Sequence, residues 1–203
     1  MHKITIFALA ALAAPMAHAT IPFTVSLESE KPGIQNSQSK FSAVGIETFD
    51  ARRTVNGQNF VSNFGGSVFS GTYSGVDIKS ADQYGGAGGT GRYAVTFAST
   101  GYSLDLASSQ PGGVTYFGFW LSALDRGNTV NFYQQGKLLF AFTADLASNF
   151  ISQLPSAASY KCNPNAAFAA RNCGEPYAFL NFYARGNTSF DRIVFAENPR
   201  VGG

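Results

Sequence analysis

Short runs in which apolar and polar residues alternate recur along the chain and predict β-strands. The run at 102–106 is typical, because Tyr102, Leu104 and Leu106 would face one side of a sheet and the residues between them the other. Further runs of strand length lie at 41–49, 67–73, 76–78, 92–97, 114–121, 129–133, 137–143, 177–184 and 190–196. About ten short strands at this spacing predict an all-β fold, a two-sheet sandwich that we expect to be jelly-roll-like.

Two local patterns add detail to this prediction. The segment Gln134-Gln135-Gly136 separates two of the predicted strands, which indicates a β-hairpin with Gly136 at a positive φ. Residues 144–154 have apolar positions at helical spacing and predict one short helix. The expected fold is therefore a sandwich with a single helical insertion.

Composition agrees with a β-rich chain that has few charges. The sequence holds 22 Gly, 19 Phe and 9 Tyr, and only 13% of its residues are charged. Its formal net charge is +2, and its basic residues do not cluster beyond Arg52-Arg53. These features disfavour nucleic acid and anionic membranes as partners.

The N-terminus has the three parts of a secretory signal peptide in their usual order. Lys3 gives a short positive region, an apolar run follows at 4–14, and Ala17 and Ala19 form a small-x-small cleavage pattern. The apolar run is too short to span a bilayer, which needs about 20 apolar residues. We expect residues 1–19 to be a signal peptide and residues 20–203 to be one secreted β-sandwich domain without a transmembrane span.

Export would remove every histidine from the chain. Both histidines, His2 and His18, lie in the predicted signal peptide. Ser-His-Asp and Cys-His catalysis need an imidazole as general base, and typical catalytic zinc sites use histidine ligands. We therefore expect a protein that is not an enzyme.

The two cysteines, Cys162 and Cys173, are expected to form a disulfide. In an exported protein such a pair most simply closes one loop. A redox-active pair is the alternative, but it usually has Cys-x-x-Cys spacing, which this sequence lacks.

A glycine-rich loop at 85–91 contains a G-x-G-x-x-G pattern. Dinucleotide binding would need a helix after this loop, whereas the residues that follow it predict a strand, so we expect no nucleotide. The alternatives are a tight loop that needs unusual backbone angles, or a ligand site. In the second case we expect Asp82, Tyr84, Tyr73 and Tyr93 to bind a ligand, with the tyrosines as a platform for sugar rings.

Carboxylates near the two ends of the domain are candidate Ca²⁺ ligands. Glu47 lies near the end of the predicted strand at 41–49, Asp50 directly follows it, and Asp191 lies in the last predicted strand. First and last strands often pair in jelly rolls, so the three carboxylates could meet and hold a structural Ca²⁺ through oxygen ligands. Solvated carboxylates, or pairs with Arg52, Arg53 or Arg192, are the alternative reading.

Several segments together resemble bacterial exosortase-dependent (PEP-CTERM) surface proteins. The segments that carry this resemblance are 82–91, 115–120, 122–125, 127–133, 179–183 and 190–195. It implies an exported, non-enzymatic protein of a Gram-negative bacterium, tied to the cell surface or exopolysaccharide matrix. Such proteins end in Pro-Glu-Pro, an apolar span and a basic tail, which do not occur before Gly203. We therefore expect either a chain truncated before the sorting tail or a secreted relative that lacks it.

Three functions are consistent with these features. The first is a non-catalytic surface or matrix protein that binds extracellular polysaccharide. The second is a structural surface protein that associates with itself through its sheets or edge strands. The third is a glycoside hydrolase that uses two carboxylates, although the sequence lacks the clustered carboxylate run of sandwich-fold glucanases.

Overall fold

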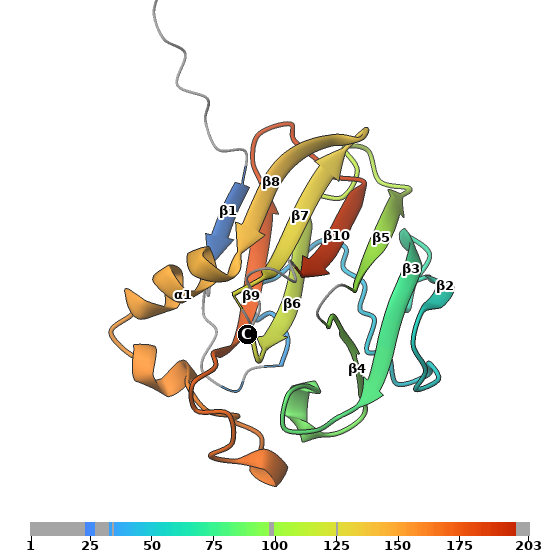
Figure 1. Cartoon of the computed structure of the whole chain (residues 1–203). Helices are drawn as coiled ribbons and strands as arrows, with labels where there is room; N and C mark the ends of the chain where they lie inside the picture. The colour runs from blue at the N-terminus through green and yellow to red at the C-terminus, as the bar shows by residue number, and fades with distance from the viewer. Residues whose placement is uncertain (1–22, 27–32, 34, 98–99, 125, 198–203) are drawn as a thin grey trace, which may run out of the picture.

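The computed structural model describes residues 23–26, 33, 35–97, 100–124 and 126–197, so the predicted signal peptide lies outside the described residues. The chain forms two antiparallel sheets with one α-helix beside them (Figure 1). The strands are β1 (Phe23–Ser26), β2 (Gln58–Ser62), β3 (Phe69–Ser80), β4 (Arg92–Val95), β5 (Gly101–Ser108), β6 (Tyr116–Ser122), β7 (Asn128–Gln134), β8 (Lys137–Thr143), β9 (Tyr177–Ala184) and β10 (Arg192–Glu197). The helices are α1 (Ala144–Ser152) and the 3₁₀ turns η1 (Ala87–Gly89), η2 (Ala157–Tyr160) and η3 (Ala166–Phe168).

The two sheets differ in width. The narrow sheet has three strands in the order β1-β9-β6. The wide sheet has seven strands, in the order β2-β3-β5-β10-β7-β8, with β4 paired to the second half of β3. The predicted all-β, two-sheet sandwich is therefore confirmed. The first and last strands are not neighbours, because β1 pairs with β9 while β10 lies between β5 and β7.

An aromatic core joins the narrow sheet to one half of the wide sheet. Phe182 of β9 and Phe132 of β7 are both fully buried, and their ring centroids lie 5.0 Å apart. Phe119 of β6 stacks on Phe182 at 5.8 Å. Each such ring contributes about 1.5–3 kcal/mol through the apolar surface that it removes from water. The inward positions of the alternating strand pattern thus provide most of the contact between the sheets.

The predicted hairpin and helix are both present. Gln135 (φ 50°) and Gly136 (φ 76°) connect β7 to β8, and two positive φ angles are typical of a type I′ turn. Helix α1 starts directly after β8, where the Thr143 side chain accepts a hydrogen bond from the main-chain N–H of Leu146. None of the helices in the described ranges is long and apolar enough to cross a membrane.

The strand predicted at 41–49 is wrong. These residues form a bent segment without regular secondary structure and pair with no strand among the described residues; residues 41–50 are called the strap below. Inward and outward positions still alternate along the strap, so Phe41 and Phe49 are partly buried while Val44 and Ile46 are exposed. The alternation of apolar and polar residues indicates only which side chains are covered. A segment that lies across a sheet can show this alternation as well as a hydrogen-bonded strand can.

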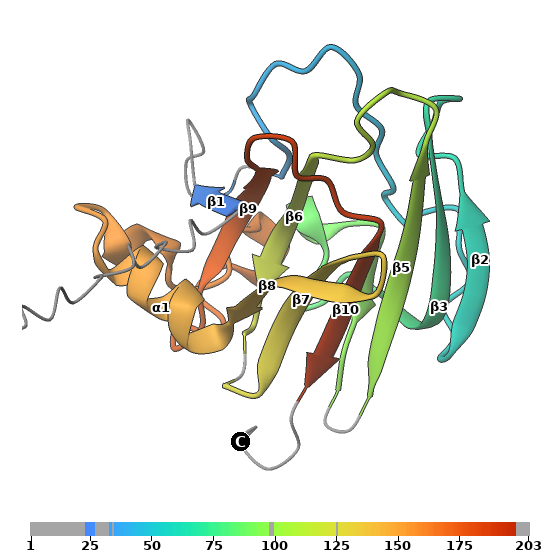
Figure 2. The ribbon, with the colours of Figure 1, turned by 90° about the horizontal axis from the view of Figure 1, so that it is seen from above.

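The strap crosses from one sheet to the other (Figure 2). Phe41 packs against Tyr116 of β6, with ring centroids 4.1 Å apart. Phe49 packs edge-on against Tyr73 of β3 at 5.5 Å. The strap therefore covers the part of the wide sheet that the narrow sheet leaves open.

Candidate functional site

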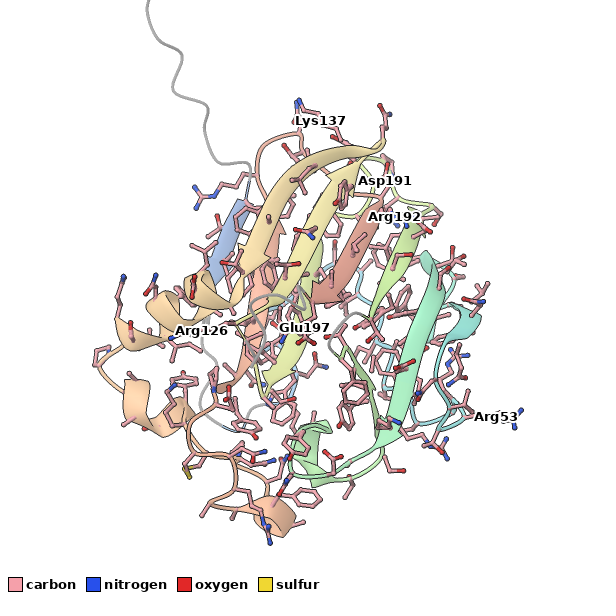
Figure 3. All side chains as sticks on the ribbon, viewed as in Figure 1. Arg53, Arg126, Lys137, Asp191, Arg192 and Glu197 are labelled. Carbon is pink, nitrogen blue, oxygen red and sulfur yellow. A yellow bond between two sulfur atoms is a disulfide. The ribbon has the colours of Figure 1, made fainter. Side chains whose placement is uncertain are left out.

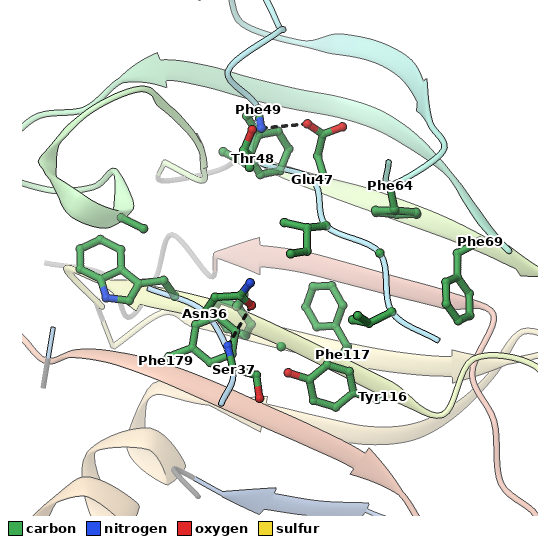
Figure 4. Close-up of a pocket in the computed structure, with 18 of the residues that line it drawn as sticks. Asn36, Ser37, Glu47, Thr48, Phe49, Phe64, Phe69, Tyr116, Phe117 and Phe179 are labelled. Carbon is green, nitrogen blue, oxygen red and sulfur yellow. Dashed lines mark hydrogen bonds between the residues drawn. The ribbon is translucent and has the colours of Figure 1, made fainter. Parts of the chain in front are cut away.

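A cleft of about 760 Å³ lies between the two sheets. One wall is β6 and the segment before it, because residues 113–120 and Ser122 all line the cleft. The facing wall is the strap, and side chains from β3, β5 and β10 form the floor (Figure 4). The cleft arises because the narrow sheet ends at β6, while the wide sheet continues through β5, β3 and β2.

The floor of the cleft is aromatic and apolar, and most of the polar residues in the lining are uncharged. Phe69 and Phe195 lie in the floor and Phe117 in the β6 wall, and hydroxyl groups come from residues such as Ser42 and Thr90. The charged residues of the lining are Glu47, Asp50 and Arg92, and each is already engaged by other groups of the chain. A ligand that fits this cleft therefore has apolar and neutral polar groups, as most pocket ligands do.

A partly buried ion pair secures the strap. Glu47 pairs with Arg52 at 2.5 Å and also accepts a hydrogen bond from the main-chain N–H of Phe49 at 2.8 Å. The Arg52 guanidinium lies over the Phe60 ring of β2, 4.0 Å from its centroid. Burial alone would raise the pKa of Glu47, but the hydrogen bonds from Arg52, Ser62 and Phe49 outweigh it and lower the pKa.

The glycine-rich loop borders the cleft and is organised by Asp82. The Asp82 carboxylate accepts hydrogen bonds from the main-chain N–H groups of Tyr84 (2.8 Å) and Gly85 (3.1 Å) and from the Tyr93 hydroxyl (3.1 Å). Burial, followed by the nearby Asp82 charge, raises the pKa of Tyr93. Strand β4 follows the loop, where a dinucleotide-binding motif would have a helix.

The predicted disulfide between Cys162 and Cys173 is present, and its loop supports the glycine-rich loop. The carbonyl oxygen of Gln83 accepts hydrogen bonds from the side chains of Asn163 (3.0 Å), Asn172 (2.7 Å) and Tyr177 (2.9 Å). Asn163 and Asn172 belong to the disulfide loop and Tyr177 to β9, so the disulfide loop and the narrow sheet together hold the glycine-rich loop at one edge of the cleft.

The predicted ligand residues do not form one platform. Tyr73 is 4% exposed and stacks on Phe60 in the core of the wide sheet. Tyr84 is 52% exposed, whereas Tyr93 is partly buried and bonded to Asp82. Tyr73 and Tyr93 both reach the lining of the cleft, but Asp82 holds the loop rather than facing a ligand. The prediction that all four act as one site is therefore not supported by their positions.

The structure does not bring the three predicted Ca²⁺ ligands together. Asp191 accepts a hydrogen bond from the main-chain N–H of Gln135 at 2.7 Å, at the β7–β8 turn. Asp50 accepts one from the N–H of Arg92 beside the glycine-rich loop, and Glu47 pairs with Arg52. In Figure 3, Asp191 and Arg53, which follows Asp50 closely in the chain, lie on different parts of the molecule.

The physical reason is the topology, since first and last strands do not pair. No group of three His, Cys, Asp or Glu side chains suited to a metal occurs in the described part of the chain. Structural Ca²⁺ at these three positions therefore has no assembled site here.

Sequence reasoning missed the walls of the cleft. The apolar run at 114–121 favours core positions for Phe117, Phe119 and Trp120, yet all three line the cleft. The indole Nε1 of Trp120 is buried and has no hydrogen-bond partner among the described residues. A signal was present in the glycine at 118, which interrupts an otherwise bulky strand.

Comparisons with known proteins add no relative to this picture. No protein-family model, curated protein sequence or solved structure matches the chain. The function must therefore be argued from the cleft and from the sequence.

Proposed function

We propose that this is an exported, non-catalytic binding protein of the bacterial surface or extracellular matrix, and that the cleft is its binding site. The observation that carries the proposal is the cleft itself, which is large, rich in aromatic rings and without a free charge among the described lining residues. Most single-ligand pockets have volumes of about 300–1,000 Å³ and a similar mixture of apolar surface and few polar groups.

Export and surface location rest on the sequence. The first 19 residues have the pattern of a signal peptide, and the disulfide is compatible with an oxidising compartment. The resemblance to exosortase-dependent proteins adds a Gram-negative surface or matrix as the proposed location. Mass spectrometry of the culture medium and cell envelope should find a mature chain that begins at Thr20. If only the uncleaved chain is found, or if the protein stays in the cytoplasm, this part of the proposal fails.

The chemistry of the cleft argues against carboxylate-dependent hydrolysis. A glycosidase acid needs a raised pKa so that it carries a proton at neutral pH. Glu47 has a lowered pKa and is held by Arg52, and the Asp50 carboxylate is bonded to the main chain of Arg92. Neither of these two carboxylates is placed to supply a proton.

An uncharged polymer suits the cleft, and extracellular polysaccharide is the ligand expected from the sequence. Sugar rings would stack on aromatic faces of the lining and bond to its hydroxyl groups. Trp120 is the single tryptophan of the chain and lines the cleft, so its fluorescence reports directly on occupancy. We expect a saturable change in Trp120 fluorescence with a ligand of this class, found by screening neutral glycans.

A blocking variant tests whether the cleft is the site. Ala43 lies on the strap and lines the cleft, whereas Ala158 is exposed on η2 and does not. We expect Ala43→Trp to weaken binding at least tenfold, while Ala158→Trp, the same change at a neutral site, has no effect in calorimetry. Equal affinity for both variants would place the binding site elsewhere.

A further inference from the structure

Strand β6 has one edge that faces the cleft. It is the last strand of the narrow sheet and pairs only with β9 among the described residues. The N–H of Ala184 bonds to the carbonyl of Thr115 at 2.8 Å, and the same register continues along the two strands. In an antiparallel pair every second residue bonds to its partner strand, and the residues between direct their N–H and C=O groups to the other edge. This parity directs the main chain of Gly118 and Trp120 toward the cleft.

The edge has none of the usual protection against pairing. Exposed edge strands normally carry Lys, Pro, a bulge or an inward charge that prevents another chain from joining the sheet. Strand β6 reads Tyr-Phe-Gly-Phe-Trp-Leu-Ser, without a charge or a proline, and its ladder with β9 has no register shift. At about 3.3 Å per residue its seven residues present an edge of roughly 23 Å. The cleft shields this edge from the open surface but leaves it unpaired with a strand.

The cleft also provides places for the side chains of an added strand. A strand beside β6 would direct alternate side chains toward the floor, where Phe69, Leu106 and Phe195 lie. Its far edge would lie toward the strap, which forms the wall opposite β6. The unpartnered indole N–H of Trp120 adds a donor on the same strand.

The charged residues of the cleft lining limit which side chains an added strand can carry. Glu47 and Asp50 both line the cleft, and the one cation of its described lining, Arg92, is bonded to the carbonyl oxygens of Asp50 and Arg52. An acidic segment would meet two carboxylates without a free cation, and a basic one would lose its hydration against phenylalanine rings. The cleft therefore fits a segment without charged side chains.

We propose that an extended, uncharged segment of another polypeptide adds to the narrow sheet beside β6 and pairs with the main chain of Gly118 and Trp120. This inference rests on the proposed function, since it takes the cleft to be the binding site. A polypeptide fits the edge better than a polysaccharide, because its N–H and C=O groups repeat at the spacing of the β6 edge. The aromatic floor would then select apolar side chains at alternate positions.

The test uses the mature protein and two synthetic peptides. The first is a seven-residue peptide that alternates Thr with Phe and Val and has blocked ends. The second has the same side chains but carries N-methyl groups on alternate residues, which remove the donors of the pairing edge. We expect the first peptide to change Trp120 fluorescence saturably and the second to bind at least tenfold more weakly.

Hydrogen exchange provides the structural readout. On binding of the first peptide, we expect the amides of Gly118 and Trp120 to exchange at least tenfold more slowly, while the amides of Phe117 and Phe119, already bonded to β9 by the same parity, change little. Ala43→Trp should abolish this protection and Ala158→Trp should preserve it.

Each other outcome overturns the inference. Equal binding of both peptides would show that main-chain pairing is not used. Glycan binding that Ala43→Trp blocks, without peptide binding, would overturn the inference and leave the proposed function intact, whereas binding of neither class would overturn both. A dimer in sedimentation experiments whose Gly118 and Trp120 amides are already protected would show that a second copy occupies the edge instead.

Discussion

The ion pair between Glu47 and Arg52 should stabilise the fold through its charge, and Glu47→Gln tests this. The Glu47 side chain is 9% exposed and that of Arg52 is 24% exposed. Removing one partner of a fully buried pair costs about 3–5 kcal/mol, and the remaining solvent access of Arg52 reduces this, so we expect a loss of about 2 kcal/mol in the free energy of unfolding. Urea denaturation of the mature protein at pH 7, followed by fluorescence, measures the loss.

An exposed pair on the same protein is the matched control. Arg192 and Asp105 lie 2.8 Å apart, and their side chains are 45% and 46% exposed. Because solvent screens such pairs, Asp105→Asn should cost less than about 1 kcal/mol. If both substitutions cost the same, burial would not explain the contribution of Glu47.

The pH dependence separates charge from packing. The folded state lowers the pKa of Glu47 below its ordinary value of 4.5, so its contribution is fully present above that value and is lost as the pH falls through the folded pKa. The stability gap between the native protein and Glu47→Gln should therefore shrink in acid. A gap of the same size at pH 7 and pH 3 would refute the electrostatic explanation.

Three further predictions concern the scaffold around the cleft. Reduction of the disulfide should lower the free energy of unfolding by about 2–3 kcal/mol in urea titrations with and without dithiothreitol, and no change would show that its loop is not constrained. Gly91→Ala should lower the free energy of unfolding by about 1 kcal/mol more than Gly57→Ala. Both glycines have a positive φ, but a Cβ at Gly91 would contact a neighbouring side chain and one at Gly57 would not. Equal losses of stability in thermal unfolding would contradict this. Burial raises the pKa of Tyr102, so stability should fall as the pH rises above about 10, where the unfolded chain ionises. Tyr102→Phe should show a smaller alkaline loss, and an identical loss would exclude Tyr102 as a cause.

Local sequence rules predicted the parts of this fold that depend on neighbouring residues. The hairpin at 134–136 follows from a glycine between two apolar runs, and β4 after the glycine-rich loop follows from its alternation. The disulfide follows because the sequence offers only two cysteines. In each case the interaction is short in sequence or has a single possible partner.

The walls of the cleft could not be predicted in this way. The continuous apolar run at 114–121 is typical of a central strand buried on both faces, but the structure places β6 at the end of its sheet. The strap at 41–50 has the alternating pattern of a strand but pairs with no described strand, whereas β6 has a nearly continuous apolar run and pairs with β9. The pattern of apolar and polar residues describes which side chains of one segment are buried. Strand pairing depends on which two segments lie side by side in the folded chain.

The sequence by itself determined the class of the fold, its short turns and the scarcity of charged residues along the chain. Only the tertiary structure decided that Asp191 lies apart from Glu47 and Asp50, that Asp82 organises a loop, and that Trp120 lines a cleft. The physical reason is the unequal width of the two sheets. Three strands cannot cover seven, so the edge of β6 and the aromatic face of the wide sheet remain beside one another, with the strap across them.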